Sequence, residues 1–312
     1  MPTLSEFLLK INIRASIAFD EPMARHTSFR IGGPADALVA PEAAADLALI
    51  VGKAGEEGIP VAILGGGANL LVGDRGIRGI VVDTRRMAGF EIEEREGAGP
   101  RLRAAAGVSV SRLCEYALSR GLGGLENFYA MPGSLGGSIF MNARCYELEM
   151  ADRLEAVSVL DVRGRFREVP FERRAWSYKS SPFQPGREEA GAVILGAAFN
   201  LERGEAVAIR ATMLARRADR EAKGHFRLPS AGSMFKNDRS LGRPTGAILD
   251  ELGFKGRRIG DAMVSPWHAN IFVNAGRATA RDMLALIDLA REETFKRLGV
   301  AIEPEVLFVG EG

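Results

Sequence analysis

Two glycine-rich loops have the composition of sites that bind a phosphate through the protein backbone. The first reads Gly65-Gly66-Gly67-Ala68-Asn69-Leu70 and follows an apolar run; the second spans 131–138 and reads Met-Pro-Gly-Ser-Leu-Gly-Gly-Ser. Glycine lets backbone N–H groups approach an anion closely, and Pro132 fixes its own φ angle. Two such loops could hold the two phosphates of one dinucleotide. The alternative is two unrelated turns, because glycine clusters mark turns more often than sites.

Neither loop carries a standard nucleotide-binding motif. Leu70 stands where the third glycine of G-x-G-x-x-G should be, and the sequence contains no G-x-x-x-x-G-K-[ST]. A Rossmann domain and a P-loop are therefore not indicated.

Candidates for acid–base chemistry lie in the C-terminal part of the chain. Ser233 stands in the turn 230–233, but no G-x-S-x-G elbow surrounds it, and a serine in such a turn is more often a cap than a catalyst. Glu305 belongs to the run 302–309, where a carboxylate opens an apolar strand. The ordinary interpretation of that carboxylate is a solvated charge at a strand end.

Metal and disulfide chemistry is not indicated. Cys114 and Cys145 have no CxxC spacing, and His26, His225 and His268 form no HxxxH or HExxH pattern. We therefore expect no metal site, so that difficult chemistry must come from a bound cofactor, from carboxylates or from hydroxyls.

The composition is that of a globular protein without a polyanionic partner. Lys plus Arg number 41 and Asp plus Glu number 40, which gives a net charge of +1, and hydrophobic residues make up 46%. This balance argues against nucleic acid and an anionic membrane surface. No apolar run approaches the roughly 18 residues of a membrane span, and charged residues interrupt the N-terminal segment. We expect a cytoplasmic protein, long enough for about two domains.

Strand-like and helix-like segments alternate and position the two loops. Strands are predicted at 60–64 and 80–83 around the first loop, after a helix through Leu47, Ile50 and Ala54. A helix follows Gly107, strands return at 154–160 and 193–199, and 176–189 reads as a long loop. A further helix begins near 205, and the last one starts at Thr279 with a capping-box pattern.

Six motifs follow one another between about residue 26 and 310. They are TSFRIGGPAD at 27–36, GGGAN at 65–69, PGSLGGS at 132–138 followed by MNA at 141–143, GSMFKN at 232–237, HAN at 268–270 and EPEV at 303–306. In this order they resemble the UDP-N-acetylenolpyruvoylglucosamine reductase family, also called UDP-N-acetylmuramate dehydrogenase. The chain resembles the shorter type of this family, since it lacks the insertion that carries a substrate-capping tyrosine.

The resemblance implies an α+β fold, in which a two-subdomain FAD-binding fold of the PCMH type is followed by a smaller α+β substrate-binding domain. The implied segments are FAD-binding subdomain 1 at 1–89, FAD-binding subdomain 2 at 90–203, the substrate-binding domain at 204–302 and a C-terminal strand at 303–312 that returns to the active site.

The activity implied by the resemblance is NADPH-dependent, FAD-mediated reduction of UDP-N-acetylglucosamine enolpyruvate to UDP-N-acetylmuramate, a step of peptidoglycan precursor synthesis. Hydride is added at C3 of the enolpyruvyl group and a proton at C2, and FAD is bound non-covalently. Ser233 aligns with the proton donor and Glu305 with the glutamate at the enolpyruvyl group, while Lys179 is the third catalytic candidate. The implied cofactor-binding residues are Gly65, Gly66, Gly67, Ala68, Asn69, Leu70, Pro132, Gly133, Ser134, Gly137, Ser138 and Asn142. The implied substrate-binding residues are Tyr178, Lys223, Asn237 and His268.

The long loop departs from the family pattern at one position. The family shows Tyr-Arg-x-Ser, with its arginine over the substrate carboxylate, whereas this chain reads Tyr178-Lys179-Ser180-Ser181. Lysine keeps the charge but loses the planar fork of arginine. Lys179 could replace the arginine, or Arg173 or Arg174 could reach in; the matching position favours Lys179.

A second departure follows the second glycine loop. The family's Asn-Ala-Gly-Ala-Tyr-Gly is Asn-Ala-Arg-Cys-Tyr-Glu at 142–147. At Arg144 and Glu147 the backbone must therefore avoid a positive φ or tolerate it at some cost. Arg144 could also add a cation near the flavin or the substrate.

Two other interpretations stay open. Flavin oxidases of the wider fold have similar glycine loops, but many tether FAD through a histidine beside the first loop, where this chain has Ala68-Asn69. The other alternative is a catalytically impaired nucleotide-binding module; Ser233 and Glu305 argue against it, and Lys179 argues for it. The expected partners are the UDP-sugar and NADPH, with no nucleic acid, no membrane and a monomeric or weakly oligomeric state.

Overall fold

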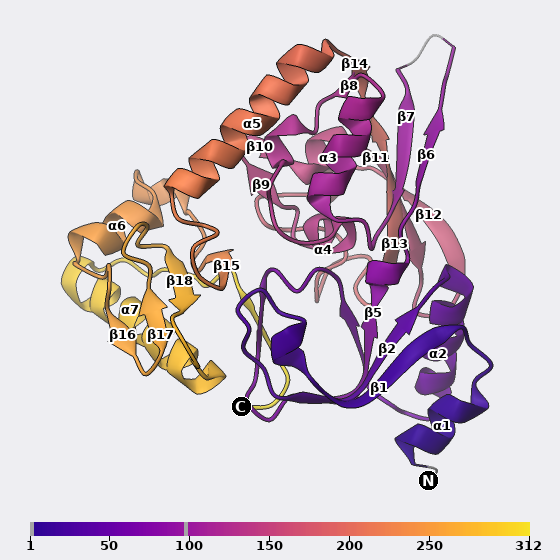
Figure 1. Ribbon diagram of the computed structural model, residues 1–312, viewed down its shortest axis with the longest axis horizontal. Coiled ribbons are helices and arrows are strands. Elements are labelled where there is room, and N and C mark those ends of the chain that lie inside the picture. Colours follow the sequence, from indigo (N-terminus) through magenta and orange to yellow (C-terminus); the bar gives the residue numbers. More distant parts are fainter. Residues whose placement is uncertain (1–2, 97–98) are drawn as a thin grey trace. The chain divides into compact units, whose positions relative to one another are not determined.

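The chain forms two compact units, each assembled from separate stretches of sequence (Figure 1). The structure is a computed structural model that describes residues 3–96 and 99–312. The first unit comprises 1–18, 37–66 and 79–218, and the second comprises 19–36, 67–78 and 219–312. The predicted segments 1–89, 90–203, 204–302 and 303–312 follow chain order instead, and their boundaries stay a prediction.

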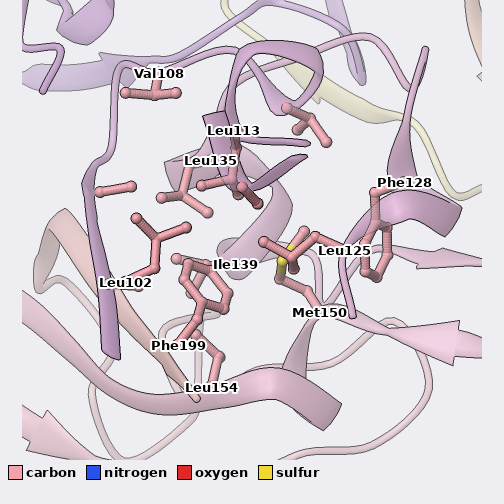
Figure 2. Packing of buried hydrophobic residues seen from close by; sticks show 14 of the residues in the cluster. Leu102, Val108, Leu113, Leu125, Phe128, Leu135, Ile139, Met150, Leu154 and Phe199 are labelled. Carbon is pink, nitrogen blue, oxygen red and sulfur yellow. The ribbon is translucent and has the colours of Figure 1, made fainter. Parts of the chain in front are cut away.

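A five-stranded antiparallel sheet lies in the first unit, in the order β12-β11-β13-β7-β6. Its strands are β6 (Phe90–Glu93), β7 (Arg101–Ala105), β11 (Leu154–Leu160), β12 (Phe166–Pro170) and β13 (Val193–Asn200). Helices α3 (Val110–Ser119) and α4 (Leu135–Phe140) belong to the same unit, and each starts at a serine whose hydroxyl accepts a backbone N–H. Figure 2 shows their buried residues packed with those of β7 and β13. The strands and the helix predicted here are confirmed.

A second sheet has the order β1-β2-β5-β3, and its strands are β1 (Ala15–Pro22), β2 (Pro34–Pro41), β3 (Val61–Leu64) and β5 (Ile77–Asp83). β3 and β5 run parallel, with Leu64 opposite Asp83, so that the first glycine loop begins directly at the end of β3. Buried residues of α1 (Leu4–Lys10) and α2 (Ala44–Glu56), Leu8 and Ile50 among them, form one hydrophobic cluster with Ile80 and Val82. The predicted helix through Leu47 and the strands beside the first loop are confirmed.

The second unit contains the four-stranded sheet β15-β18-β17-β16 and two helices. The elements are β15 (Ser230–Ser233), β16 (Arg258–Ile259), β17 (Ala262–Val264), β18 (Ile271–Asn274), α6 (Thr245–Glu251) and α7 (Ala280–Leu298). The capping box predicted at Thr279 and Asp282 is confirmed. In the same unit β19 (Leu307–Val309) pairs in parallel with β4 (Leu70–Val72), and Glu305 lies two residues before the start of β19.

The remaining elements are short, apart from one helix. They are α5 (Ala206–Ala222), β8 (Leu122–Gly123), β9 (Arg144–Cys145), β10 (Leu148–Glu149), β14 (Glu202–Arg203) and the 3-10 turns Met23–Arg25, Thr84–Arg86, Glu126–Phe128, Met150–Arg153, Arg173–Ala175 and Arg239–Leu241. Residues 176–189 form no regular helix or strand, as predicted. Within the described ranges, no helix is long and apolar enough to cross a membrane.

Candidate functional site

In the first unit, the beginning of the first glycine loop lies directly against the second loop. The Gly66 N–H donates to the Ser134 hydroxyl oxygen at 3.1 Å. A Cβ on Gly66 would stand 2.5 Å from the Gly133 Cα, and one on Gly65 would stand 2.3 Å from the Ser134 Oγ. These distances leave no room for a side chain. Two loops 68 residues apart in sequence are thus held backbone to backbone, as a dinucleotide site requires.

Ser134 also caps the helix that follows the second loop. Its Oγ accepts the Gly137 N–H at 3.5 Å, its carbonyl accepts the N–H and the hydroxyl of Ser138, and its side chain is buried. One serine therefore fixes both loops and the start of α4. Pro132 and Gly137 remain exposed beside it.

The rest of the first loop belongs to the second unit and is tied to the C-terminal segment there. Gly67 has φ +62°, and a Cβ on it would stand 2.0 Å from the His26 carbonyl oxygen. The Asn69 side-chain amide donates to the Glu305 carbonyl at 3.0 Å, while the Leu307 N–H donates to the Asn69 carbonyl at 3.0 Å. Asn69 therefore links the loop to the backbone of the candidate glutamate.

Backbone donors in both loops remain available to a bound anion. In the described part of the chain, the N–H groups of Gly65, Gly133 and Ser134 in the first unit donate to no other residue, and neither do those of Gly67 and Ala68 in the second unit. Gly67 and Ser134 are buried and the other three residues are half-buried, so these unpaired donors fit a ligand that carries phosphates. The residues present thus fit the FAD that the sequence predicts.

The segment that follows Ser233 is hydrogen-bonded on one side to Asn270 and on the other side to Glu305, all within the second unit. On one side, Asn270 accepts the Met234 N–H at its carbonyl (2.7 Å) and the Phe235 N–H at its Oδ1 (2.9 Å), and its Nδ2 donates to the Phe235 carbonyl at 2.8 Å. On the other side, the Glu305 N–H donates to the Met234 carbonyl at 2.8 Å. Ser233 and Glu305 are therefore carried by adjacent, hydrogen-bonded segments.

Asn270 was not among the candidates predicted from sequence. It is 1% exposed, and its backbone N–H donates to the His268 Nδ1 at 3.1 Å. That bond makes Nδ1 the acceptor, so the proton of the neutral imidazole is on Nε2, where it can be donated to a ligand. An asparagine inside the motif at 268–270 was the only signal in the sequence.

Three of the predicted substrate residues lie in the same region of the second unit. Burial, and then the positive charge of Lys223, lower the pKa of His268. The Lys223 ammonium itself pairs with Asp219 at 2.7 Å. The exposed Asn237 accepts the Thr245 N–H at 2.9 Å. The next residue, Gly246, packs against the imidazole of His268, where a Cβ would stand 2.9 Å from Cε1.

His225 makes the stability of the second unit sensitive to acid. Its ring centroid lies 6.4 Å from that of His268. Burial, and then Arg220, His268 and Lys223, lower its pKa from 6.5 to about 4, against the opposing charge of Asp219. The folded protein therefore holds the neutral imidazole at a pH where the unfolded chain is already protonated.

We expect His225 to lose its stabilising contribution as the pH falls from about 6.5 to about 4. Urea unfolding at about pH 7.5 and about pH 5 checks this: the midpoint should fall more for the wild type than for His225→Asn. An equal fall in the two proteins would show that another group controls the acid sensitivity.

The last candidates, Tyr178 and Lys179, lie in a turn of the first unit. Ser177 and Ser180 exchange backbone hydrogen bonds across this turn, at 3.1 and 2.9 Å, and Lys179 has φ +56°. The Lys179 ammonium lies 5.9 Å from the centroid of the Tyr178 ring. Both side chains are half-buried.

The side chain of Asn142 is hydrogen-bonded to this turn. It is fully buried, and its Nδ2 donates to the Ser177 carbonyl at 2.8 Å and to Glu149 Oε2 at 3.0 Å, while its Oδ1 accepts the Ala151 N–H at 3.1 Å. Its amide hydrogens and oxygen are thus used within the protein. Any contribution of Asn142 to cofactor binding must come through its backbone or through the turn that it holds.

The backbone conformation differs between Arg144 and Glu147, the two residues that replace family glycines. Arg144 lies in the short strand β9, which has an extended backbone, whereas Glu147 keeps a positive φ of +69°. A left-handed conformation costs a residue with a Cβ about 1–2 kcal/mol.

Glu147→Gly is expected to stabilise the protein by about 0.5–1 kcal/mol, because relief of the left-handed strain exceeds the greater chain entropy of glycine. Thermal unfolding should show a higher Tm for this variant. Glu147→Ala is the matched control, since it removes the carboxylate and keeps the Cβ, and its Tm should not rise. A rise in both would assign the effect to the carboxylate.

Arg173 and Arg174 both pair with carboxylates of the protein. Arg173 pairs with Asp152 at 3.0 Å and Glu149 at 3.5 Å, and the largely exposed Arg174 pairs with Glu172 at 2.8 Å. These contacts favour Lys179 as the replacement for the family arginine. Among the described residues, no group of three or more His, Cys, Asp or Glu is arranged to hold a metal ion.

Two protein families match two different stretches of the chain. Residues 35–170 match the family described as "FAD binding domain", and residues 224–309 match "UDP-N-acetylenolpyruvoylglucosamine reductase, C-terminal domain". The chain is 37% identical to the UDP-N-acetylenolpyruvoylglucosamine reductase of Treponema denticola, over 95% of this chain and 94% of that protein. It is 41% identical to that of Rubrobacter xylanophilus, over 94% of this chain and 95% of that protein. The solved structure of the Thermus caldophilus enzyme superimposes with a TM-score of 0.75 at 31% identity, over 95% of this chain and 99% of that one.

Proposed function

This chain belongs to the UDP-N-acetylenolpyruvoylglucosamine reductase family, and we infer that it is the flavin-dependent oxidoreductase that converts UDP-N-acetylglucosamine enolpyruvate to UDP-N-acetylmuramate in peptidoglycan precursor synthesis. The resemblance stated from six motifs and the predicted fold class are confirmed. The observation that carries the function is full-length similarity together with two glycine loops in backbone contact.

The glycine loops hold the cofactor. When bound there, FAD would supply the hydride chemistry between NADPH and the enolpyruvyl double bond. Its phosphates would be held by unpaired backbone N–H groups, those of Gly133 and Ser134 in the first unit and those of Gly67 and Ala68 in the second, and Ser134 keeps the second loop in place. Since binding relies on backbone donors, the geometry of the loops matters more than their side chains.

Ser233 delivers the proton that reduction requires at C2. A hydroxyl is a weak acid, so it donates effectively only to a strongly basic carbon, such as the one that develops negative charge during reduction of the enolpyruvyl group. Ser233 is half-buried at the end of β15, directly before the clamped residues Met234 and Phe235, which fix its backbone. Glu305, in the neighbouring segment, orients this proton and polarises the substrate.

Cations and donors bind the remaining parts of the substrate. Lys179, beside Tyr178, binds the carboxylate of the enolpyruvyl group. Lys223 attracts the pyrophosphate of the UDP moiety, and the protonated Nε2 of His268 donates a hydrogen bond to the nucleotide sugar. Asn237 contributes through its side-chain NH₂ group, while its Oδ1 accepts the N–H of Thr245, the first residue of α6. The protein works in the cytoplasm as a monomer or weak oligomer.

Product analysis in D₂O tests this function. The protein, NADPH and the enolpyruvyl sugar should yield UDP-N-acetylmuramate with one solvent deuterium at C2 and the NADPH-derived hydrogen at C3, as measured by mass spectrometry and NMR. Hydrogen peroxide formation from substrate and oxygen would indicate a flavin oxidase instead. Binding without consumption of NADPH would indicate a nucleotide-binding module.

A further inference from the structure

The ring of Tyr178 is contacted by two cations from different segments of the first unit. The Arg144 guanidinium carbon lies 5.6 Å from the ring centroid, and the Lys179 ammonium lies 5.9 Å from it. Cations at such distances from an aromatic face are attracted by its quadrupole. Tyr178 thus brings together Arg144, which stands where the family has glycine, and Lys179, which stands where it has arginine.

Arg144 is more buried than its ion pair with Glu147 explains. Its side chain is 16% exposed, whereas that of Glu147, with which it pairs, is 81% exposed. An ion pair with so exposed a carboxylate contributes little to stability. A guanidinium has five donors in a rigid fork, so one carboxylate at its edge leaves capacity for a second anion.

A strained hairpin holds Arg144 in this position. Arg144 of β9 lies opposite Glu149 of β10, and the two turn residues, Tyr146 and Glu147, have φ +48° and +69°. Such a turn normally carries Asn-Gly, because both of its central residues need a positive φ. The Arg216 guanidinium, 4.2 Å from the Tyr146 ring centroid, and a Tyr146 hydroxyl bond to the Arg216 carbonyl (3.3 Å) help to hold it.

Asn142 connects this hairpin to the Tyr178 turn. Its Nδ2 donates to Glu149, which lies opposite Arg144 in the two-stranded sheet. The same Nδ2 donates to the Ser177 carbonyl, one residue before Tyr178. Backbone strain that is held by such specific contacts is typical of functional sites. The distance between Arg144 and Lys179 is therefore set by a buried hydrogen-bond network.

We propose that Arg144 and Lys179 form a two-cation site beside Tyr178 that binds the carboxylate of the enolpyruvyl substrate and stabilises the negative charge that develops as the double bond is reduced. This rests on the proposed function. Lysine alone is a point charge that cannot bind a carboxylate with two parallel hydrogen bonds; Arg144 supplies the planar fork that position 179 lacks. No covalent bond to Arg144 forms or breaks.

Substitutions at both positions of the FAD-loaded enzyme test the proposal. Arg144→Gln should raise the KM for the enolpyruvyl sugar, or slow flavin reoxidation by it, about 10- to 100-fold, and leave flavin reduction by NADPH unchanged. Arg144→Lys should lose less, because it keeps the charge. Lys179→Arg in the Arg144→Gln background should recover most of the loss, since it restores a guanidinium. Arg174→Gln, which removes an exposed guanidinium of the same unit, is the control and should behave as the wild type.

Flavin reoxidation at the wild-type rate in Arg144→Gln would overturn the proposal. A loss that Lys179→Arg does not rescue would also overturn it, because that result is expected if Arg144 has only a structural role. If the wild type itself were not reoxidised by the enolpyruvyl sugar, the proposed function would fail. The two-cation site would then still be tested by binding of that sugar to the oxidised enzyme, followed by the flavin spectrum. Equal affinity in wild type and Arg144→Gln would overturn the site.

Discussion

Ser233→Ala is expected to slow reoxidation of the reduced flavin by the enolpyruvyl substrate about 10²- to 10⁴-fold and to leave flavin reduction by NADPH near its wild-type rate. The asymmetry follows from the chemistry, because a proton is required at C2 only when the substrate is reduced. The methyl group of alanine fits the same backbone, since Asn270 and Glu305 hold the following residues through main-chain bonds. Anaerobic stopped-flow absorbance measures the two half-reactions separately.

Ser230→Ala is the matched control for this prediction. Ser230 lies in the same strand, β15, and pairs with Val273 of β18, so that its loss changes the strand without removing the proposed acid. We expect wild-type rates in both half-reactions. If Ser233→Ala slowed both half-reactions equally, the serine would serve the cofactor or the fold and not the proton transfer.

Gly66→Ala is expected to give a protein that binds FAD poorly. The added Cβ would stand 2.5 Å from the Gly133 Cα and 2.7 Å from the Ser134 backbone nitrogen, and backbone atoms cannot move aside as a flexible side chain can. Forced separation of the loops should destabilise the protein by about 1–3 kcal/mol. If FAD binding loses the same amount, its affinity falls about 5- to 150-fold. Flavin absorbance after titration with FAD, together with Tm, measures both effects.

Gly52→Ala provides the control for this second prediction. Gly52 lies in α2 of the same unit, and a Cβ there would meet no atom within 4 Å. Alanine should therefore raise the stability by about 0.5–1 kcal/mol through its helix propensity, with full FAD binding. A Gly66→Ala protein that keeps its flavin and its Tm would contradict the close contact between the loops.

Local sequence signals predicted the elements that position the site. The periodicity of Leu47, Ile50 and Ala54 predicts α2, the capping box at Thr279 predicts the start of α7, and the glycines mark both loops. These features depend on residues a few positions apart, which a single sequence displays directly. The resemblance added which residues of these elements carry out chemistry.

Contacts between distant residues could not be read from the sequence. Asn270 binds Phe235 at a separation of 35 residues, and Asn142 binds Ser177 at the same separation; nothing local in either segment indicates its partner. The sequence likewise left Lys179, Arg173 and Arg174 as alternatives. The matching position favoured Lys179, and the structure adds that Lys179 lies beside Tyr178 together with Arg144, while Arg174 pairs with Glu172.

The central claim is that this chain passes hydride from NADPH through bound FAD to the enolpyruvyl sugar. The most direct measurement is the visible spectrum of the purified protein under anaerobic conditions, recorded before and after addition of NADPH and then of UDP-N-acetylglucosamine enolpyruvate. We predict a yellow protein that NADPH bleaches and the enolpyruvyl sugar recolours. A colourless protein that takes up no FAD, or one that stays bleached with the sugar until oxygen is admitted, would contradict the claim.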